Sequence, residues 1–372
     1  MSKPKSSRNK KEKEVPIELG FLEEDDPSHS YKLRSAFFPS KFGGLPAWLD
    51  LKNIPTATDV KCGVCDQPGK FLLQVYAPME TEDSFHRTLF LFVCPNKRCC
   101  VERNSNKNLV VLRSQLRQLN DFYSDQAPDE KDKTLGELSP ISFGVTMCHV
   151  CGIKSTQSCS KCGIIYYCGK DHQKLDWSGG HKDKCESANK ETLSAAPVET
   201  FCYKEHALVI DTEVIPKQKE KTEKERLDDF EKLVSEGQAG TLDDTAQTAD
   251  MLEAASLKSD KAFNKFKKRV AYHQDQVLRY DRKGSPLWVS ADKTIEIKDV
   301  PPCPYCKGAR VFEFQIMPQL LNYVGDDSIL GDLDWGTLAV YTCEKNCADD
   351  GPSYKQEFIW QQDFKADEKD ND

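Results

Sequence analysis

Eight cysteine and histidine residues, spaced in pairs within one short stretch, constrain this chain more than any other feature. The stretch runs from Met147 to Cys185 and reads MCHVCGIKSTQSCSKCGIIYYCGKDHQKLDWSGGHKDKC. Its metal-binding side chains form four pairs: Cys148 and Cys151, Cys159 and Cys162, Cys168 and His172, and His181 and Cys185. Zinc takes four thiolate or imidazole ligands in a tetrahedron. Four correctly spaced pairs therefore predict two complete zinc sites.

The spacing within each pair suits a small metal-binding module. Two cysteines separated by two residues can reach one ion from a single tight turn. Residues four apart are neighbours on a helix, so Cys168 with His172, and His181 with Cys185, each offer two ligands from one helical face. A module of this size has no room for a large apolar core, and we therefore expect metal binding to supply its folding energy. We expect it to fold separately from the rest of the chain.

The order of these residues, with Tyr167, Gln173 and Trp177 among them, resembles the MYND zinc finger. The resemblance implies that the ligands interleave between two zinc ions. It assigns Cys148, Cys151, Cys168 and His172 to one ion, and Cys159, Cys162, His181 and Cys185 to the other. His172 stands where most members have cysteine, and imidazole is an equally good zinc ligand. The resemblance also places Gln173 and Trp177 near the groove in which MYND fingers of corepressors bind Pro-rich peptides.

Composition narrows the class of protein. The chain has 372 residues, 16 cysteines and a net charge of -8. Its first residues, MSKPKSSRNKKEKE, lack an apolar region of the secretory kind, so the cysteines point to metal binding in a reducing compartment and not to disulfides. No apolar run approaches the roughly 18 residues that span a bilayer, so we expect no membrane partner. The acidic balance disfavours bulk nucleic-acid binding and is compatible with a basic partner.

A second pattern precedes the finger. Cys62 and Cys65 form a C-x2-C pair, and two strand-like runs follow at Phe71 to Tyr76 and Thr88 to Val93. Cys94 follows the second run directly, with Cys99 and Cys100 just beyond. This arrangement is typical of a zinc ribbon and predicts a third zinc on Cys62, Cys65, Cys94 and either Cys99 or Cys100. The sequence does not choose between the last two.

The same pattern recurs near the other end of the chain. GSPLWV at 284–289 matches GLPAWL at 44–49, and CPYC at 303–306 matches CGVC at 62–65. FEFQIMP from Phe312 matches FLLQVYAP from Phe71, and LAVYTCEKNC at 338–347 matches LFLFVCPNKRC at 89–99. Four co-linear matches indicate a duplicated cassette. They predict a fourth zinc on Cys303, Cys306, Cys343 and Cys347.

These observations predict a β-rich α+β chain with two homologous zinc-braced cassettes packed together and the finger inserted between them. The sheets would offer free edges for strand addition by a partner. The expected segments are a basic disordered tail at 1–14, a first cassette at 15–140, the finger at 148–185, a largely disordered linker at 190–257, a helix and second cassette at 258–365, and an acidic tail at 366–372.

One helix is expected just before the second cassette. The spacing of Phe263, Phe266 and Val270 puts all three on one helical face. Such a face would pack on the second cassette or dock a partner, and packing on the chain's own cassette is the simpler interpretation.

The whole order of cassette, finger and cassette resembles the programmed cell death protein 2 family. The motifs that carry this resemblance are PSKFGGLPAWL, FLLQVYAP, NDFYS, QVLRY, PLWVS, FEFQIMPQLLNY and DWGTLAVYTC. The resemblance implies a duplicated β-rich fold of the TYPP type. It also implies a dedicated chaperone that binds ribosomal protein S2 of the 40S subunit, supports 40S biogenesis, and shuttles between cytoplasm and nucleus, including the nucleolus.

Three other functions compete with a chaperone. A transcriptional corepressor or adaptor would bind Pro-rich peptides through the finger at Gln173 and Trp177. RNA binding, through the basic tail and the finger's lysines, is expected to be weak if it occurs. No Gly-rich cofactor loop, GxSxG, Walker or HExxH motif is present, so we expect no enzyme.

Overall fold

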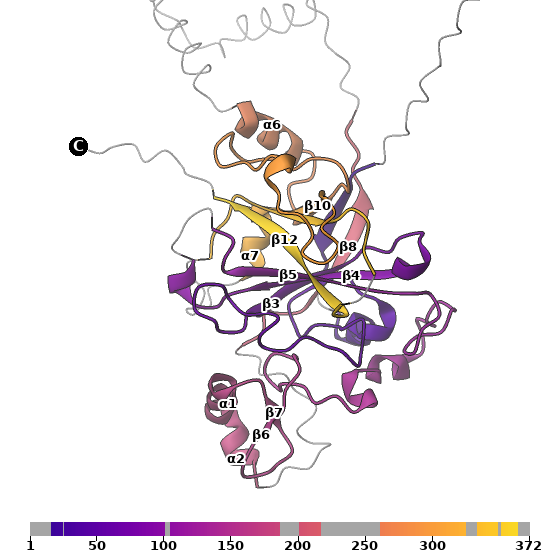
Figure 1. Ribbon diagram of the computed structural model, residues 1–372, viewed down its shortest axis with the longest axis vertical. Coiled ribbons are helices and arrows are strands. Elements are labelled where there is room, and N and C mark those ends of the chain that lie inside the picture. The colour runs from indigo at the N-terminus through magenta and orange to yellow at the C-terminus, as the bar shows by residue number, and fades with distance from the viewer. Residues whose placement is uncertain are drawn as a thin grey trace, which may run out of the picture.

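The main body of the protein is a closed barrel of ten antiparallel strands, seen in a computed structural model (Figure 1). The described residues are 16–24, 26–100, 105–186, 201–216, 261–324, 333–348 and 351–363. The strand order around the barrel is β1-β8-β2-β3-β4-β5-β12-β11-β10-β9. The expected tails at 1–14 and 366–372 lie outside the described residues.

Each of the two matching segments contributes four consecutive strands. The first gives β2 (Lys41–Phe42), β3 (Lys70–Tyr76), β4 (His86–Val93) and β5 (Leu109–Leu116). The second gives β9 (Leu278–Tyr280), β10 (Arg310–Ile316), β11 (Thr337–Cys343) and β12 (Tyr354–Gln362). The predicted strands at Phe71 to Tyr76 and Thr88 to Val93 are confirmed as parts of β3 and β4. We call these two sets of strands, with the loops between them, the first and second halves.

The two halves share one barrel instead of packing as separate cassettes. At one junction β12 pairs with β5, and Tyr354 lies opposite Ser114. At the other, β1 (Glu18–Leu22) and β8 (His206–Thr212) form a ribbon that pairs with β9 on one side and β2 on the other. Closure removes the unpaired strand edges that two separate sheets would expose. Among the described residues the barrel therefore offers no edge for strand addition, contrary to the expectation from sequence.

The linker expected at 190–257 contains part of this body. Residues 201–216 are described, and they include β8, which pairs with both β1 and β2. This strand is hard to recognise from sequence, because HALVIDT lacks an alternation of apolar and polar residues and only Leu208 of its seven residues is buried. The remainder of the expected linker lies outside the described residues.

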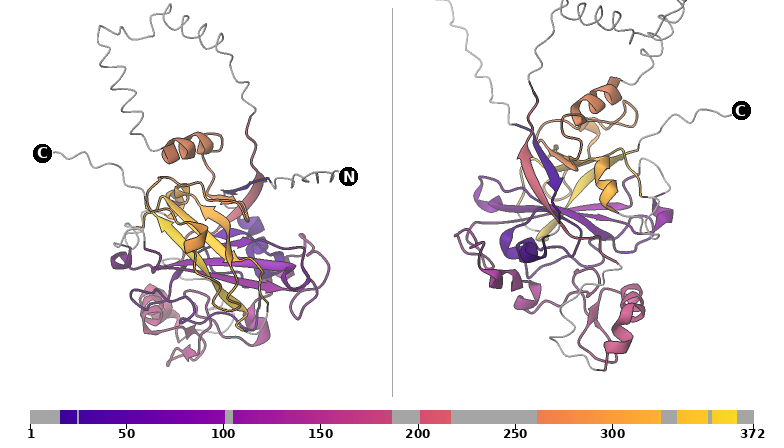
Figure 2. Two further views of the ribbon diagram at one scale, coloured as in Figure 1. Left: turned by 45° about the horizontal axis from the view of Figure 1, so that its top comes forward. Right: turned by 180° about the vertical axis from the view of Figure 1, so that it is seen from behind.

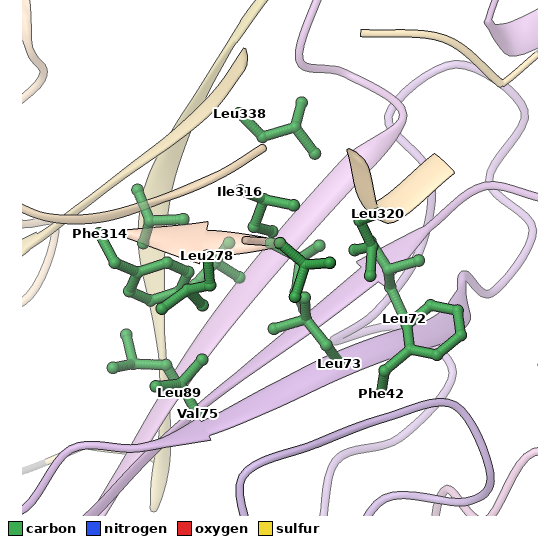
Figure 3. Packing of buried hydrophobic residues seen from close by; sticks show 14 of the residues in the cluster. Phe42, Leu72, Leu73, Val75, Leu89, Leu278, Phe314, Ile316, Leu320 and Leu338 are labelled. Carbon is green, nitrogen blue, oxygen red and sulfur yellow. The ribbon is translucent and has the colours of Figure 1, made fainter. Parts of the chain in front are cut away.

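Apolar side chains from both halves fill the barrel interior (Figure 3). Leu73 and Leu89 come from the first half, and Phe314 and Leu338 come from the second. Each is almost fully buried, and burying one such side chain contributes about 1.5–3 kcal/mol. This shared cluster is what holds the two halves together as one folding unit.

A second apolar cluster covers the outer face of the first half. Strand side chains alternate between faces, so Phe90 and Phe92 of β4 point outward while Leu89 points to the interior. Trp48 packs on both phenylalanines, with ring centroids 5.1 Å and 6.1 Å away. The finger covers this cluster from outside, beside β3 in Figure 1.

The finger itself is built from short elements. They are β6 (Gln157–Ser158), β7 (Tyr166–Tyr167), α1 (Lys170–Asp176), a π-helical turn at Trp177–His181, and α2 (Lys182–Lys184). β6 and β7 form a separate two-stranded ribbon.

Two further α-helices contact or lie within the second half. In α6 (Lys261–Val270), Phe266 is buried against Val289 and Met317, which confirms that this helix packs on the chain's own second half. It lies at the end of the barrel opposite the finger (Figure 2). α7 (Leu321–Val324) follows β10.

Short 3-10 turns connect these elements. They lie at Pro27–Leu33, Ser35–Phe37, Glu82–Ser84, Lys97–Cys99, Lys133–Glu137, Pro140–Phe143, Ile297–Asp299 and Pro318–Leu320. Within the described ranges, no helix has the length and apolar character needed to cross a bilayer.

Candidate metal centres

The fold brings four groups of four cysteine or histidine side chains together. In each group the ligand atoms all lie within 4.8 Å of one another. The groups are Cys62, Cys65, Cys94 and Cys99; Cys148, Cys151, Cys168 and His172; Cys159, Cys162, His181 and Cys185; and Cys303, Cys306, Cys343 and Cys347. We refer to them below as the Cys62, Cys148, Cys159 and Cys303 centres. The two groups in the finger are therefore the same two ligand sets that the MYND resemblance assigns to its two zinc ions.

The sulfur atoms are spaced as zinc requires. Thiolates at about 2.3 Å from a tetrahedral zinc lie about 3.8 Å from one another. The Sγ atoms of Cys65 and Cys94 are 3.6 Å apart, and those of Cys303 and Cys347 are 3.7 Å apart. All four groups hold thiol or imidazole donors, which are the ligands of structural zinc. The residues thus fit Zn²⁺.

The two histidines face their groups through different ring nitrogens. His172 Nδ1 lies 3.5 Å from Cys148 Sγ and 3.1 Å from Cys168 Sγ. His181 Nε2 lies 3.5 Å from Cys159 Sγ. A nitrogen and a sulfur bound to one tetrahedral zinc are about 3.5 Å apart, so both rings are placed as ligands would be. His172 lies in the first turn of α1, just after Cys168, as the helical spacing suggested.

All four C-x2-C pairs close in the same way. The N–H of the residue after the second cysteine donates to the carbonyl oxygen of the first, at 2.8–3.0 Å. That residue has a positive φ in each case. The four residues are Asp66, Gly152, Gly163 and Lys307. This turn aims both thiols of a pair to the same side of the backbone.

The structure places Cys99, and not Cys100, with the other three side chains of the Cys62 centre. The turn at Lys97–Cys99 is capped by Asn96, whose side chain accepts from the N–H of Arg98 at 3.1 Å. This turn directs Cys99 inward. The Cys100 thiol instead lies 3.8 Å from the carbonyl oxygen of Asn96.

The local environment makes several of these thiols poor acids. Burial raises the pKa of Cys99 and of Cys347 to about 12 each. By contrast, a hydrogen bond from the N–H of Gly308 lowers the pKa of Cys306 to about 7. A bound divalent cation supplies the positive charge that ionised, buried thiolates need, which couples metal binding to folding. Four protein ligands complete the tetrahedron, which is the arrangement of a structural site.

The Cys148 centre is part of the body and not of a separate module. Trp48 Nε1 donates to the carbonyl oxygen of Gly152 at 2.8 Å, and the N–H of Lys154 donates to that of Pro55 at 2.8 Å. Cys148 and Cys151 belong to the same apolar cluster as Trp48. The expectation of an independently folding finger is therefore wrong for this half of it. The Cys159 centre, by contrast, forms its own small cluster with Tyr167.

Gln173 and Trp177 lie one turn apart on the helix of the finger, where the N–H of Trp177 donates to the carbonyl oxygen of Gln173. Trp177 is half-buried and packs against the cluster of the Cys159 centre. Its ring meets that of His181 edge-on, with centroids 5.7 Å apart. A groove of about 550 Å³ lies on another side of the finger, between Leu175, Phe201 and Pro68, and neither Gln173 nor Trp177 lines it.

Cys202 and His206 do not join any of the four groups. Cys202 Sγ lies 3.6 Å from the carbonyl oxygen of Val150, and His206 Nδ1 lies 3.0 Å from that of Glu23.

Sequence reasoning missed a set of buried ion pairs inside the barrel. Arg87 pairs with Glu313 at 2.7 Å and Arg113 pairs with Glu357 at 2.7 Å, with all four side chains fully buried. The partners lie more than 200 positions apart in sequence, so no local pattern marks them. The only available signal is the presence of charged residues within otherwise apolar strands.

Family models match three parts of the chain. Residues 16–130 match the model described as programmed cell death protein 2, N-terminal domain. Residues 260–363 match the model of its C-terminal putative domain, and residues 148–185 match the MYND finger.

Several curated proteins are similar over most of their length. Programmed cell death protein 2 of Bos taurus is 40% identical over 94% of this chain and 97% of its own. The protein of that name in Mus musculus is 39% identical over 94% and 96%. Probable 20S rRNA accumulation protein 4 of Schizosaccharomyces pombe is 24% identical over 82% and 87%. No solved structure gives a significant match.

Proposed function

The chain belongs to the programmed cell death protein 2 family, and from this we propose that it is a non-enzymatic escort for ribosomal protein S2 of the 40S subunit. In this proposal it holds the newly made basic protein and supports 40S ribosome biogenesis, in both cytoplasm and nucleus. The observation that carries the proposal is the similarity to the Schizosaccharomyces pombe protein, whose name connects it with accumulation of 20S rRNA. The choice of client comes from the family resemblance.

We propose zinc as the ion in all four centres, with the four side chains of each group as its ligands. The sulfur spacings and the donor types support this assignment. Because each centre is closed by four protein ligands, none offers the open position that a catalytic zinc keeps for water or substrate. This chemistry supports a structural role for the metal and a binding role for the protein.

Charge supports a basic client. The net charge is -8. A groove of about 440 Å³ near the start of the chain is lined by Glu23, Glu24, Asp26 and Glu205, together with His29 and Lys32. Acidic surface of this kind speeds encounter with a basic protein and disfavours wrong partners. Since the barrel is closed, the client would be held by side chains and loops and not by strand pairing with the barrel.

The two halves of the barrel are proposed to be copies of one ancestral unit. Gln74 Oε1 accepts from the N–H of Ala47 at 2.9 Å, and Gln315 Oε1 accepts from that of Leu287 at 2.5 Å. Ala47 and Leu287 occupy the same place in GLPAWL and GSPLWV. β3 and β10 also carry a register shift at the same place, after Phe71 and after Phe312. Two unrelated folds would not need to share these details.

The test is a tagged pull-down of the full chain from cytosol, with and without ribonuclease, analysed by mass spectrometry. We expect one dominant, stoichiometric ribosomal protein that persists after ribonuclease treatment. Glu23→Lys/Glu24→Lys should weaken its capture, and Glu80→Lys/Glu296→Lys, which changes the net charge equally, should not. Recovery of chromatin or corepressor proteins without a ribosomal protein would contradict the escort proposal.

The MYND match supports a second candidate, an adaptor that binds Pro-rich peptides through the finger. Gln173 and Trp177 are the residues to test, because the resemblance places them at the peptide groove. Trp177→Ala would then abolish capture of a Pro-rich peptide and leave the ribosomal protein bound. Equal loss of both partners would show that the two activities share one surface.

A further inference from the structure

The barrel interior holds two glutamates that are each paired with two arginines. Glu313 contacts Arg87 at 2.7 Å and Arg282 at 2.9 Å. It also accepts hydrogen bonds from Tyr280 and Thr342, at 2.6 Å and 2.5 Å. All of its hydrogen-bonding capacity is thus satisfied inside the barrel.

Glu357 has the same arrangement. Arg113 contacts one of its oxygens at 2.7 Å, and Arg310 contacts the other at 3.0 Å. Arg87 and Arg113 are fully buried, Arg310 is 5% exposed and Arg282 is 12% exposed.

These pairs leave an excess of positive charge. Four guanidinium groups (+4) and two carboxylates (-2) sum to +2. An unbalanced charge in a protein interior is strongly unfavourable unless a partner of opposite sign is near. The two glutamates therefore account for only half of the buried positive charge, and the rest needs another partner.

The nearest candidate is the Cys303 centre, which borders the cluster. Arg113 Nη2 lies 3.8 Å from Cys347 Sγ and 3.4 Å from the carbonyl oxygen of the same residue. Arg310 Nη1 donates to the carbonyl oxygen of Pro301 at 3.1 Å, just before Cys303. Glu357 accepts from the N–H of Cys343 at 3.1 Å. Both cysteine-bearing turns are therefore tied to the ion pairs.

The charge of this centre is opposite in sign to the excess, to which the buried Lys355, opposite Arg113 in the sheet, adds further positive charge. Zn²⁺ with four thiolates carries a net charge of -2. We propose that the buried arginines are the countercharge of the Cys303 centre and position its two cysteine turns. The inference rests on the zinc assignment made above and is independent of the ribosomal client.

Two of the arginines and the four cysteines come from different halves of the barrel. Arg87 lies on β4 and Arg113 on β5, so both come from the first half, whereas all four cysteines of the centre come from the second. The metal centre of the second half is therefore completed by the first half. Metal binding there and closure of the barrel stabilise each other, because each favours the same arrangement of charges.

The Cys62 centre provides an internal comparison. It also consists of four cysteines, yet among the described residues no ion pair with both side chains buried contacts it. The two finger centres each contain a histidine, and with three thiolates they carry a charge of only -1. The rate of zinc release should thus depend on buried arginines only at the Cys303 centre.

The test measures metal release from the full-length zinc-loaded chain, with a chromogenic chelator for the rate and elemental analysis for the stoichiometry. The release phase of the Cys303 centre is identified as the one that is missing in Cys303→Ser. Arg113→Gln should release this one ion about 10- to 100-fold faster, the range for loss of groups that orient metal ligands. Arg113→Lys, which keeps the charge, should release it nearly as slowly as the wild type, and the exposed Arg117→Gln should behave as the wild type.

Two further variants keep the test decisive. Arg282→Gln removes a charge at the least buried of the four arginines, and it should accelerate the same phase if Arg113→Gln fails to fold. In Arg113→Gln/Glu357→Gln the excess returns to +2, so release should be slower than in Arg113→Gln. Unchanged release in Arg113→Gln, or equal acceleration at all four centres, would overturn the proposal. A wild-type chain with no release phase assignable to Cys303 would instead overturn the zinc assignment.

Discussion

The indole Nε1 of Trp48 donates a hydrogen bond to the carbonyl oxygen of Gly152 at 2.8 Å. Trp48 belongs to the outer apolar cluster of the first half, and Gly152 closes the first cysteine turn of the finger. The bond therefore joins a metal centre to the core of the body. The finger's other centre has its own cluster and no such connection among the described residues.

Loss of the Cys148 centre should destabilise the barrel, whereas loss of the Cys159 centre should not. Cys148→Ser removes a ligand from the cluster that covers β4, and we expect the barrel to lose about 3 kcal/mol or more, as in other losses of a metal site. Cys159→Ser should change barrel stability by less than about 0.5 kcal/mol. Hydrogen exchange measured by mass spectrometry separates peptides of β4 from those of the finger.

Elemental analysis is the control for this pair, since each variant should lose one zinc ion. The interpretation fails if both variants protect the β4 amides equally well, because the finger would then be a separate unit after all.

A matched pair of glycine substitutions probes the same contact from the finger side. Gly152 and Gly163 both have a positive φ, at 72° and 66°, so alanine costs about 1–2 kcal/mol at either position. A Cβ at Gly152 would lie 3.3 Å from Pro46 and 3.4 Å from Leu45, whereas a Cβ at Gly163 meets nothing within 4 Å. Gly152→Ala should therefore cost about 1–3 kcal/mol more in urea unfolding than Gly163→Ala. Equal costs would show that Gly152 does not need its close approach to the body.

The grouping of the candidate metal ligands could be predicted because they come in local pairs. A turn or one helical face fixes the spacing of Cys148 and Cys151, or of Cys168 and His172, within a few residues of sequence. This local spacing stays the same however the rest of the chain folds. The choice of Cys99 over Cys100 required the capped turn after Asn96, which neighbouring cysteines cannot reveal.

The closed barrel could not be predicted in the same way. β1 and β8 are separated by the whole of the first half and the finger, and β8 has no strong alternation of apolar and polar residues. The pairing of β5 with β12 and the pair Arg87 with Glu313 likewise depend on contacts between distant segments. Sequence patterns report local geometry, and these contacts are set by closure of the whole sheet.

Two of the four cysteine turns carry strain that glycine would relieve. Asp66 and Lys307 hold the left-handed conformation that glycine adopts at Gly152 and Gly163. Lys307 has a φ of 58°, and its side chain is exposed. Lys307→Gly should therefore be more stable than Lys307→Ala by about 1 kcal/mol, because only glycine lacks the Cβ that makes this conformation costly. Thermal unfolding of the zinc-loaded variants measures the difference, and an alanine variant as stable as the glycine one would contradict it.

Glu313 should make the barrel sensitive to acid in a defined range. Burial alone would raise the pKa of this carboxyl, but Arg87 and Arg282 and the hydroxyl of Thr342 outweigh it and lower the pKa to about 2. In the unfolded chain the pKa of a glutamate is about 4.3. Because the folded value is the lower one, the contribution to stability is complete above about pH 4.3 and is lost as the pH falls towards 2. A shift of about two units corresponds to about 3 kcal/mol.

Denaturant unfolding of wild type and Glu313→Gln between pH 7 and pH 2 tests this dependence. The variant should be less stable at pH 7 by about 3–5 kcal/mol, since it leaves Arg87 and Arg282 without a charged partner. Its stability should then fall less steeply than that of the wild type below pH 4.3, because it lacks the group that takes up a proton there. Glu313 belongs to the charge cluster beside the Cys303 centre, so the bound zinc of both proteins is measured at each pH, and the slopes are compared at equal zinc content. The exposed Glu344→Gln should follow the wild type, and a Glu313→Gln slope equal to the wild-type slope would mean that Glu313 is not ionised in the folded barrel.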